Sequence, residues 1–285
     1  MTDFHLAFKA HDVHELGCHF IARHAGLYDR HGLRPTLVDA TFTPDNALPA
    51  RSFSAACGAA LAAWLQGADA RVVFVATDRP MFWVYGRPGV RALADLEGEL
   101  IAGYPPAAPP AVFLQELWNS HGLAPAGLQV CAARDDVARV GLLRDGGVAA
   151  ALVSSAVPPG VMRAFGFEPL VFVGDEIRVA TTGLAASPEL CEREPALVAA
   201  LCACYSEALA LVHGDTAVVD AALRSGVAPV GGDVASLAAV LTRCYTADGR
   251  SPAERLQQGA DRMARAMGVN GARPVSGLYD FSFLK

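Results

Sequence analysis

The sequence of 285 residues lacks several features that mark specialised classes of protein. It has no basic run, and its 23 lysines and arginines are outnumbered by 29 aspartates and glutamates, giving a formal net charge of −6. Nucleic-acid binding needs a basic patch, so we expect no nucleic-acid partner. Aromatic residues make up only 8% of the chain, yet hydrophobic residues reach 53%, which is enough for a large core. We therefore expect one large or two medium globular domains.

Signals for export or membrane insertion are also missing. A secretory signal has a basic start and an apolar stretch of about 7 to 15 residues, whereas this chain enters a strand-like run at residues 4–8. We expect no apolar stretch to reach the roughly 18 residues that span a bilayer, because even the Ala-rich run from Ala55 is broken by Gln66 and Asp69. We expect a cytoplasmic protein without membrane insertion, or alternatively a periplasmic one whose leader was removed.

The seven cysteines form no CxxC pair of the kind that binds zinc. They lie at positions 18, 57, 131, 191, 202, 204 and 244. Most have apolar neighbours, which is typical of buried thiols in a reducing compartment. The sequence also has no phosphate loop, dinucleotide fingerprint or Ser-His-Asp order, so nucleotide-dependent chemistry is disfavoured.

Short apolar runs alternate with longer segments of helical period, the pattern of βαβ units and a mainly parallel sheet. The predicted strands cover residues 4–8, 36–40, 72–76, 100–102, 128–131, 149–153 and 169–173. The clearest helices cover residues 13–30, 55–66, 110–120 and 136–144. Two helices end alike, at His31-Gly32 and at His121-Gly122, which predicts two lobes that each start with their own βαβ unit.

Two extended segments, Met81–Tyr85 and Glu176–Ala186, are predicted to carry the chain out of the first lobe and back. From residue 188 to residue 267 the pattern is helical. The sequence thus predicts an α/β fold of two lobes with two hinge crossings and a C-terminal helical segment. Residues 1–83 and 179–285 would form lobe one, and residues 84–178 would form lobe two.

Four segments carry a family resemblance. Residues 92–103, with the sequence ALADLEGELIAG, match the entry into the second lobe of the nitrate/sulfonate/taurine-type solute-binding proteins. Residues 26–33 resemble that family's first helix, and residues 54–61 resemble the loop and helix that come next. Residues 181–185 resemble its return strand, so the order along the chain is the same. The resemblance implies the periplasmic-binding-protein type 2 fold, a small-molecule ligand between the lobes and, if the protein is exported, a transporter permease as partner.

The same superfamily includes cytosolic enzymes, among them the thiamine pyrimidine synthases and menaquinone-pathway synthases. The cysteine-rich iron motif of the thiamine enzymes is missing here. Where the receptors hold an anionic head at a helix N-terminus, residues 103–110 are rich in prolines, which have no N–H group. This departure favours an aromatic or mostly apolar ligand, against Tyr104 and Pro105, over a sulfonate or nitrate.

The densest polar cluster, residues 9–19, follows the first predicted strand, at the edge of a parallel sheet where clefts form. His11 and His14 are therefore candidates for ligand contact or acid/base catalysis. With Cys18 they also form a weak candidate for zinc or iron. Otherwise we expect no metal, and no cofactor is identified. The competing interpretation is structural, because Asp12 and Glu15 have the spacing of a helix-capping box.

Other candidate side chains lie at predicted strand and helix ends. Cys57 follows Ser54 near a helix N-terminus, where the dipole lowers a thiol's pKa, so it is a third catalytic candidate; alternatively both residues only line the cleft. Ser154 and Ser155 end a strand of lobe two and are expected to bind ligand. Arg178, on the return crossing, is the candidate partner of a ligand carboxylate.

Two functions remain open at this point. The first is an ABC-transporter-type solute-binding protein whose lobes close over an aromatic or monocarboxylate-like molecule. The alternative is a cytosolic enzyme on the same fold that uses the N-terminal histidines for acid/base or metal-assisted chemistry on a small aromatic or heterocyclic substrate. A third alternative, a cytosolic sensor domain without catalysis, would differ from the solute-binding protein only in its output.

Overall fold

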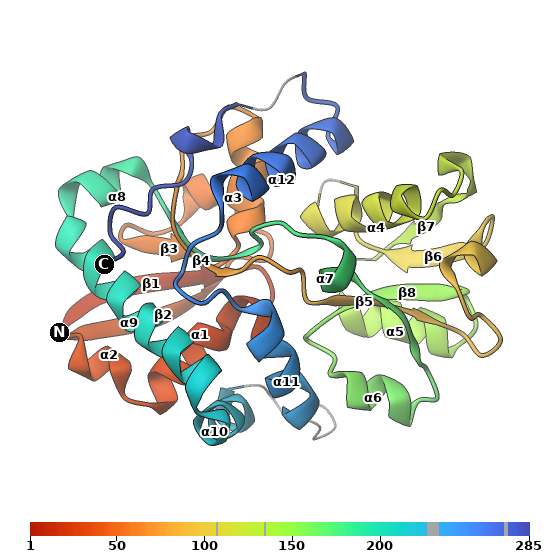
Figure 1. Ribbon diagram of the computed structural model, residues 1–285, viewed down its shortest axis with the longest axis horizontal. Helices are drawn as coiled ribbons and strands as arrows, with labels where there is room; N and C mark the ends of the chain where they lie inside the picture. Colours follow the sequence, from red (N-terminus) through yellow and green to blue (C-terminus); the bar gives the residue numbers. More distant parts are fainter. Residues whose placement is uncertain (107, 134, 227–233, 271–272) are drawn as a thin grey trace.

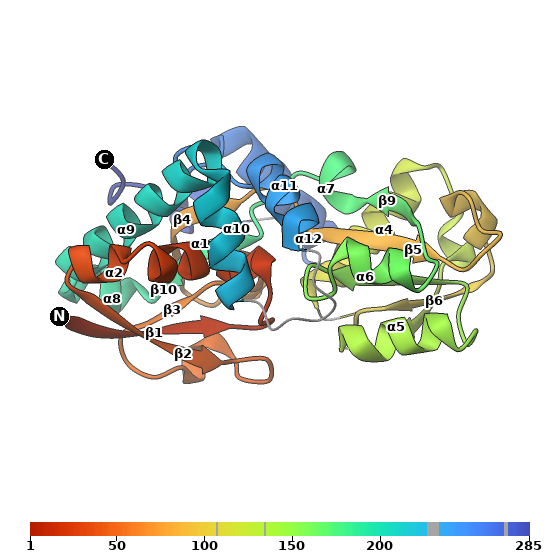
Figure 2. The same ribbon diagram turned by 90° about the horizontal axis from the view of Figure 1, so that it is seen from below.

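The computed structural model describes residues 1–106, 108–133, 135–226, 234–270 and 273–285, and it has two lobes lying side by side (Figures 1 and 2). Each lobe is built on a five-stranded sheet. The first sheet contains β1 (Thr2–Phe8), β2 (Leu33–Asp39), β3 (Ser52–Ser54), β4 (Arg71–Thr77) and β10 (Thr182–Ala186), in the order β2-β1-β3-β10-β4. The second contains β5 (Phe82–Gly86), β6 (Leu100–Gly103), β7 (Gln129–Ala132), β8 (Ala150–Ser154) and β9 (Pro169–Phe172), in the order β7-β6-β8-β5-β9. The predicted two-lobed α/β fold is confirmed.

Helices cover both sheets. Lobe one has α1 (Val13–His24), α2 (Leu27–Arg30), α3 (Cys57–Leu65), α8 (Pro188–Arg193), α9 (Pro195–Gly214), α10 (Thr216–Gly226), α11 (Val234–Cys244) and α12 (Ala253–Ala266). Lobe two has α4 (Pro109–Ser120), α5 (Asp136–Arg144), α6 (Pro159–Ala164) and α7 (Val173–Glu176). Short 3₁₀ turns lie at Asp45–Ala47, Leu93–Leu96, Pro125–Gly127 and Val275–Gly277.

The positions of helices and strands depart from the sequence-based expectation at several segments. The helix expected over residues 13–30 is interrupted, because Gly26 takes a left-handed conformation with φ of +65° between α1 and α2. Residues 82–86 form β5, which pairs antiparallel with β8 and β9 inside the second sheet, so they are a strand of lobe two and not a free crossing. The three-residue strand β3 was not predicted.

Strand direction brings the loops of both lobes to the junction. In the first sheet β1 runs parallel to β2 and β3, and in the second sheet β6 runs parallel to β7 and β8. β10 runs antiparallel to β3 and β4, so its first residues lie where β4 ends. Loops at the carboxyl ends of parallel strands gather at one sheet edge, which is where α/β proteins form their clefts.

The C-terminal helices complete lobe one. α9 packs against α1 and β4, and α10 packs against α1. Tyr245, just after α11, donates a hydrogen bond of 2.8 Å from its hydroxyl to the carbonyl of Val13. Gly17 makes room for this ring, since a Cβ there would lie 2.1 Å from the tyrosine oxygen. The C-terminal helices therefore pack onto α1 and the first sheet.

One helix contradicts the expectation about apolar length. α9 is long and apolar enough, by length and composition, to cross a membrane, so the expectation that no stretch reaches that length is wrong. Half of its apolar window is buried inside the protein, and core helices of soluble proteins pass the same test.

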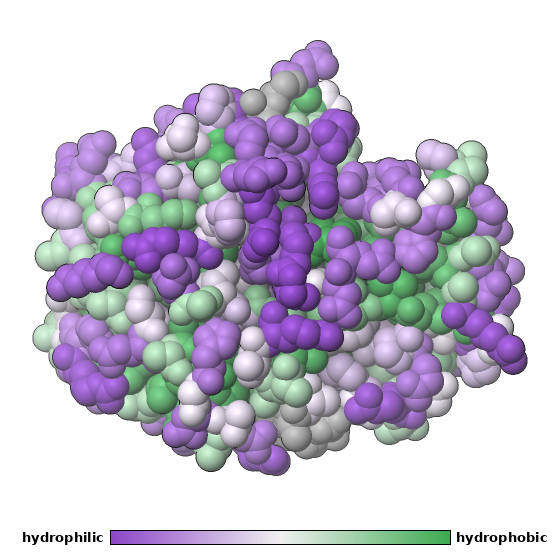
Figure 3. Space-filling model, in the orientation of Figure 1, coloured by the Kyte–Doolittle hydropathy of each residue, from purple (hydrophilic) through white to green (hydrophobic). Residues whose placement is uncertain are grey.

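Ion pairs join the two hinge crossings to the C-terminal helices. Asp78, on the outgoing crossing, accepts from Arg178 on the return crossing at 3.3 Å and from Arg255 of α12. Asp175 of α7 pairs with Arg243 of α11 at 3.5 Å. Strongly hydrophilic residues gather along the middle of this face, over the junction of the lobes (Figure 3).

Candidate functional site

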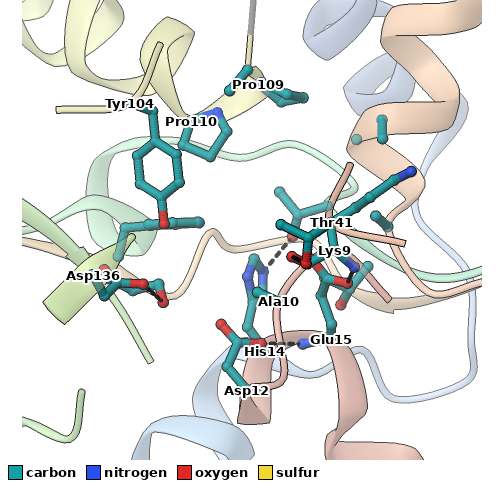
Figure 4. A pocket seen from close by; sticks show the side chains of 18 of the residues that line it. Lys9, Ala10, Asp12, His14, Glu15, Thr41, Tyr104, Pro109, Pro110 and Asp136 are labelled. Carbon is teal, nitrogen blue, oxygen red and sulfur yellow. Dashed lines mark hydrogen bonds between the residues drawn. The ribbon is translucent and has the colours of Figure 1, made fainter. Parts of the chain in front are cut away.

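A cavity of about 410 Å³ lies between the carboxyl edges of the two sheets. Lobe one and the return crossing contribute the loops after β1 and β2, the start of α3 and the residues before and in β10: Lys9, Ala10, Asp12, His14, Glu15, Thr41, Phe42, Thr43, Pro44, Ala56, Gly58, Ala59, Thr181 and Thr182. Lobe two contributes Phe82, Tyr104, Ala108, Pro109, Pro110, Phe113, Asp136 and Ser154. Figure 4 shows Tyr104 and Pro110 across the cavity from His14, Glu15 and Thr41.

His14 is the histidine of the predicted cluster that faces the cavity. It lies in the first turn of α1 and is 4% exposed, with its Nε2 2.8 Å from the Thr181 hydroxyl. The Thr181 hydroxyl is in turn 2.7 Å from that of Thr77. Burial lowers the pKa of His14 to about 3, so the ring is neutral at physiological pH. A neutral imidazole beside a hydroxyl can accept a proton or orient a ligand.

Asp12 and Glu15 place two carboxyl groups beside His14. Asp12 caps α1 by accepting a 2.9 Å hydrogen bond from the Glu15 amide, and Glu15 accepts a 2.8 Å bond from the Lys9 amide. Burial, with a contribution from the charge of Asp136, raises the pKa of Asp12 to about 7. Burial and the charge of Asp12 raise the pKa of Glu15 to about 8. The predicted capping role of Asp12 is thus confirmed, and both groups also line the cavity.

The wall from lobe two is aromatic. Phe82 meets the ring of His14 edge-on at 5.4 Å between centroids, and the ring of Tyr104 at 5.7 Å. The guanidinium of Arg139, fully buried on α5, lies 3.7 Å from the Tyr104 ring centre and holds it in place. Arg139 also pairs with Asp136. The result is a fixed, mostly apolar surface with one ion pair at its edge.

The two lobes touch beside the cavity. The backbone N–H of His14 in lobe one donates to the Ser155 hydroxyl of lobe two at 3.0 Å. Ser154 donates from its hydroxyl to Asp136 at 2.8 Å, and its own amide donates to the same carboxylate at 2.9 Å. The structure therefore has its lobes in contact, with Ser155 as the joining side chain.

The structure brings only part of the predicted site into the cavity. His14, Tyr104 and Ser154 line it, and Ser155 lies directly behind, in contact with His14. His11 is exposed and sits against the rings of Phe8 and Phe20, outside the cavity lining. Of the two candidate histidines, His14 therefore lines the cavity and His11 does not.

Cys57 and Ser54 lie behind the wall. Cys57 is fully buried, with its thiol directed at the Phe74 carbonyl at 3.7 Å. Burial raises the pKa of this thiol, so the expectation that the helix dipole lowers it is wrong. Ser54 is 4% exposed, and its hydroxyl has no hydrogen-bond partner among the residues that the structure describes. Neither residue is among those that line the cavity.

Pro105, Arg178 and Cys18 also fall outside the lining. Arg178 is occupied by Asp78 at the hinge, which explains why it is not offered to a ligand. Cys18 is buried in the core of lobe one, so it does not join His11 and His14 as a metal ligand. Within the described ranges, no three His, Cys, Asp or Glu side chains come together as a metal site.

Sequence reasoning missed Thr181, Thr182 and Asp136 as cavity residues. The threonines precede and begin β10, whose antiparallel direction brings its start to the same edge as the carboxyl end of β4. Asp136 begins α5, which follows β7. The rule that sheet-edge loops carry function would have found Asp136, whereas the threonines required knowledge of strand order.

No protein-family model matches the sequence, and no curated protein matches it. Solved structures match over nearly the full chain. The periplasmic aliphatic sulphonate binding protein SsuA from Escherichia coli superposes with a TM-score of 0.74 at 17% identity, covering 97% of this chain and 96% of SsuA. A conserved Candida albicans gene product with the generic periplasmic binding protein fold gives a TM-score of 0.73 at 14% identity, covering 100% and 98%.

This chain has the periplasmic-binding-protein fold. An enzyme shares it: the desulfurization enzyme DSZB superposes with a TM-score of 0.74 at 14% identity, covering 99% of this chain and 97% of DSZB. A cysteine-to-serine mutant of DSZB has been seen in complex with biphenyl-2-sulfinic acid. Identities this low establish the architecture alone, and the activity has to be argued from the cavity.

Proposed function

We propose that the protein binds a small, largely aromatic organic molecule between its lobes and closes over it by rotation about the two crossings, in the manner of an ABC-type solute-binding protein. The cavity carries this proposal, because both lobes line it and its volume of about 410 Å³ is in the range of small-molecule sites. Aromatic side chains on the lobe-two wall, Phe82, Tyr104 and Phe113, support an aromatic ligand.

The sequence also allowed a monocarboxylate ligand, and the cavity does not support that choice. Arg178, the expected partner for a carboxylate, pairs with Asp78 outside the cavity. Lys9 lines the cavity, and its ammonium is 2.8 Å from Asp45. A ligand carboxylate would have to compete with these internal partners.

The cellular compartment in which the protein works is also part of this proposal. Seven free cysteines, six of them buried, support a reducing environment such as the cytoplasm. The periplasmic location of SsuA supports the alternative, in which a transporter permease would be the partner. The resemblance to thiamine pyrimidine synthases stays a prediction.

Ligand binding is tested with native mass spectrometry of the purified protein and thermal unfolding against a panel of small aromatic compounds. A ligand at 100 times its Kd stabilises the folded state by about 2.7 kcal/mol. Ala59→Trp, which fills the cavity, should abolish the thermal shift, whereas Ala63→Trp on the same helix and outside the cavity should keep it. Equal shifts in both variants would show that binding occurs elsewhere.

One observation favours a second function, catalysis on the same fold. The His14 Nε2 lies 2.8 Å from the Thr181 hydroxyl at the cavity wall, which is the contact between a nucleophile and a base that a base-activated nucleophile requires. The enzyme DSZB shows that this fold supports chemistry. Ligands found in the screen should be incubated with the protein and re-weighed by mass spectrometry. A product that disappears in His14→Asn supports catalysis, and an unchanged ligand mass supports binding alone.

A further inference from the structure

Helices α1 and α3 begin at the cavity and use several of their first N–H groups inside the protein. At α1, the amide of His14 donates to Ser155 at 3.0 Å and that of Glu15 donates to Asp12 at 2.9 Å. At α3, the amide of Gly58 donates to the Thr181 carbonyl at 2.9 Å. An oxyanion binds at a helix N-terminus through such groups, so at these three amides it would first have to displace an internal partner.

The start of α4 is closed to anions in a different way. Its first two residues, Pro109 and Pro110, have no N–H group. The next amide, that of Ala111, donates to the Ala108 carbonyl at 2.9 Å. Lobe two therefore presents proline rings at the point where an anionic head would need donors.

The charged side chains of the cavity wall are mostly acidic. Asp12, Glu15 and Asp136 line it, against the single lysine Lys9 within the described lining. Lys9 already forms an ion pair, with its Nζ 2.8 Å from the Asp45 carboxylate. The local balance is therefore negative once Asp12 and Glu15 ionise, and charges partly shielded from water interact more strongly than in bulk water.

Two of these carboxyl groups lack a basic partner within the described ranges. Asp136 is paired with Arg139 at 2.5 Å. For Asp12 and Glu15, no salt bridge is formed with any Lys, Arg or His in the part of the chain that the structure describes, and the charge of Lys9 offsets only part of the effect of burial on Glu15. Both sit beside His14, which burial keeps neutral. Asp12 is buried and Glu15 is partly buried, so their ionised forms are unfavourable here, and a positively charged ligand group would stabilise them.

We infer that the cavity selects an organic cation, an ammonium or amidinium group on an aromatic body, with the cationic group at Asp12 and Glu15 and the ring against Phe82 and Tyr104. This inference rests on the proposed function and names its ligand class. It predicts a preference opposite to that of the sulphonate-binding SsuA on the same fold.

Binding of such a cation is coupled to proton release. Burial raises the pKa of Asp12 to about 7 and that of Glu15 to about 8, so in the empty cavity at pH 6 both groups are mostly protonated. The cation binds their charged forms, and the displaced protons go to the buffer. Affinity for a ligand of fixed charge therefore rises with pH, by about tenfold per pH unit for each carboxyl group that has to ionise.

The test compares three ligands that differ only in the group attached to a phenylethyl skeleton: 2-phenylethylamine, 2-phenylethanol and 2-phenylethanesulfonate. The naphthyl analogue of each is included. Binding to the intact protein is measured by calorimetry. We expect the amine to bind at least tenfold more tightly than the alcohol, and the sulfonate to bind weakest. (2-Phenylethyl)trimethylammonium, whose charge does not change with pH, should bind at least tenfold more tightly at pH 8 than at pH 6.

Variants separate this inference from the proposed function. Asp12→Asn and Glu15→Gln keep the acceptor oxygens that hold the amides of Glu15 and Lys9, so the fold is retained while the preference for the amine should fall at least tenfold. Asp215→Asn, at the start of α10, is the matched control and should change nothing. Tighter binding of the alcohol or sulfonate would overturn the cation inference and keep the proposed function. If none of the compounds binds to the native protein or shifts its thermal unfolding, both are overturned.

Discussion

Replacing Asp12 by asparagine should change how stability depends on pH. The side chain is 1% exposed, and its pKa is raised from 3.8 to about 7, mainly by burial. The unfolded chain releases this proton near pH 4 and the folded protein only near pH 7, so ionisation favours unfolding as pH rises through that window. At about 1.36 kcal/mol per pH unit, the loss between pH 4 and pH 8 is about 4 kcal/mol.

The Asp12→Asn variant keeps the cap on α1, since the amide oxygen of the new side chain can accept from the Glu15 amide. The variant should therefore match the wild type within about 1 kcal/mol at pH 4 and exceed it by about 2 to 4 kcal/mol at pH 8. Urea unfolding followed by circular dichroism at pH 4, 5, 6, 7 and 8 gives this difference, with Asp215→Asn as the capping control. A difference that stays constant across the series would refute the assigned burial of Asp12.

Three further outcomes check other parts of the structure. Ser155→Ala removes the hydrogen bond that joins the lobes at His14. Because such a bond contributes about 1 kcal/mol net, ligand binding should weaken by about fivefold, and calorimetry should show an unchanged stoichiometry. Asp78→Asn breaks two hinge ion pairs and should lower the free energy of unfolding by about 2 kcal/mol, whereas Asp220→Asn, which breaks an exposed helical pair, should cost under about 0.5 kcal/mol. Native labelling with iodoacetamide should modify Cys131, the half-buried thiol, before the six buried ones; peptide mass mapping would show a contrary order.

The sequence predicted the fold well because strand alternation and helix stops are local signals. All seven predicted strands are present, and the two glycine helix stops, Gly32 and Gly122, take left-handed conformations with φ of +66° and +70°. The errors occurred where tertiary packing decides the outcome. The segment at 82–86 is apolar enough for any buried strand, and only its pairing with β8 and β9 assigns it to lobe two.

The site was predicted in outline and not in its chemistry. His14, Tyr104 and Ser154 were identifiable because each follows or ends an apolar strand. Asp12 was assigned to capping alone, although a capping carboxylate at a sheet edge can also face a ligand. Its raised pKa depends on which groups fold nearby, and that information lies in residues more than a hundred positions away, such as Asp136 and Ser155.

The inferred ligand charge also bears on how the lobes close. Asp12 belongs to lobe one and Asp136 to lobe two, and with the lobes in contact the charge of Asp136 adds to burial in raising the pKa of Asp12. Ionisation of Asp12 therefore opposes closure when the cavity is empty. A cation bound beside Asp12 reverses the sign of that interaction, because it attracts both carboxylates at once. The same pair of charges would thus hold the empty protein more open at high pH and favour the closed state once ligand is bound, which is the differential affinity that ligand-driven closure requires.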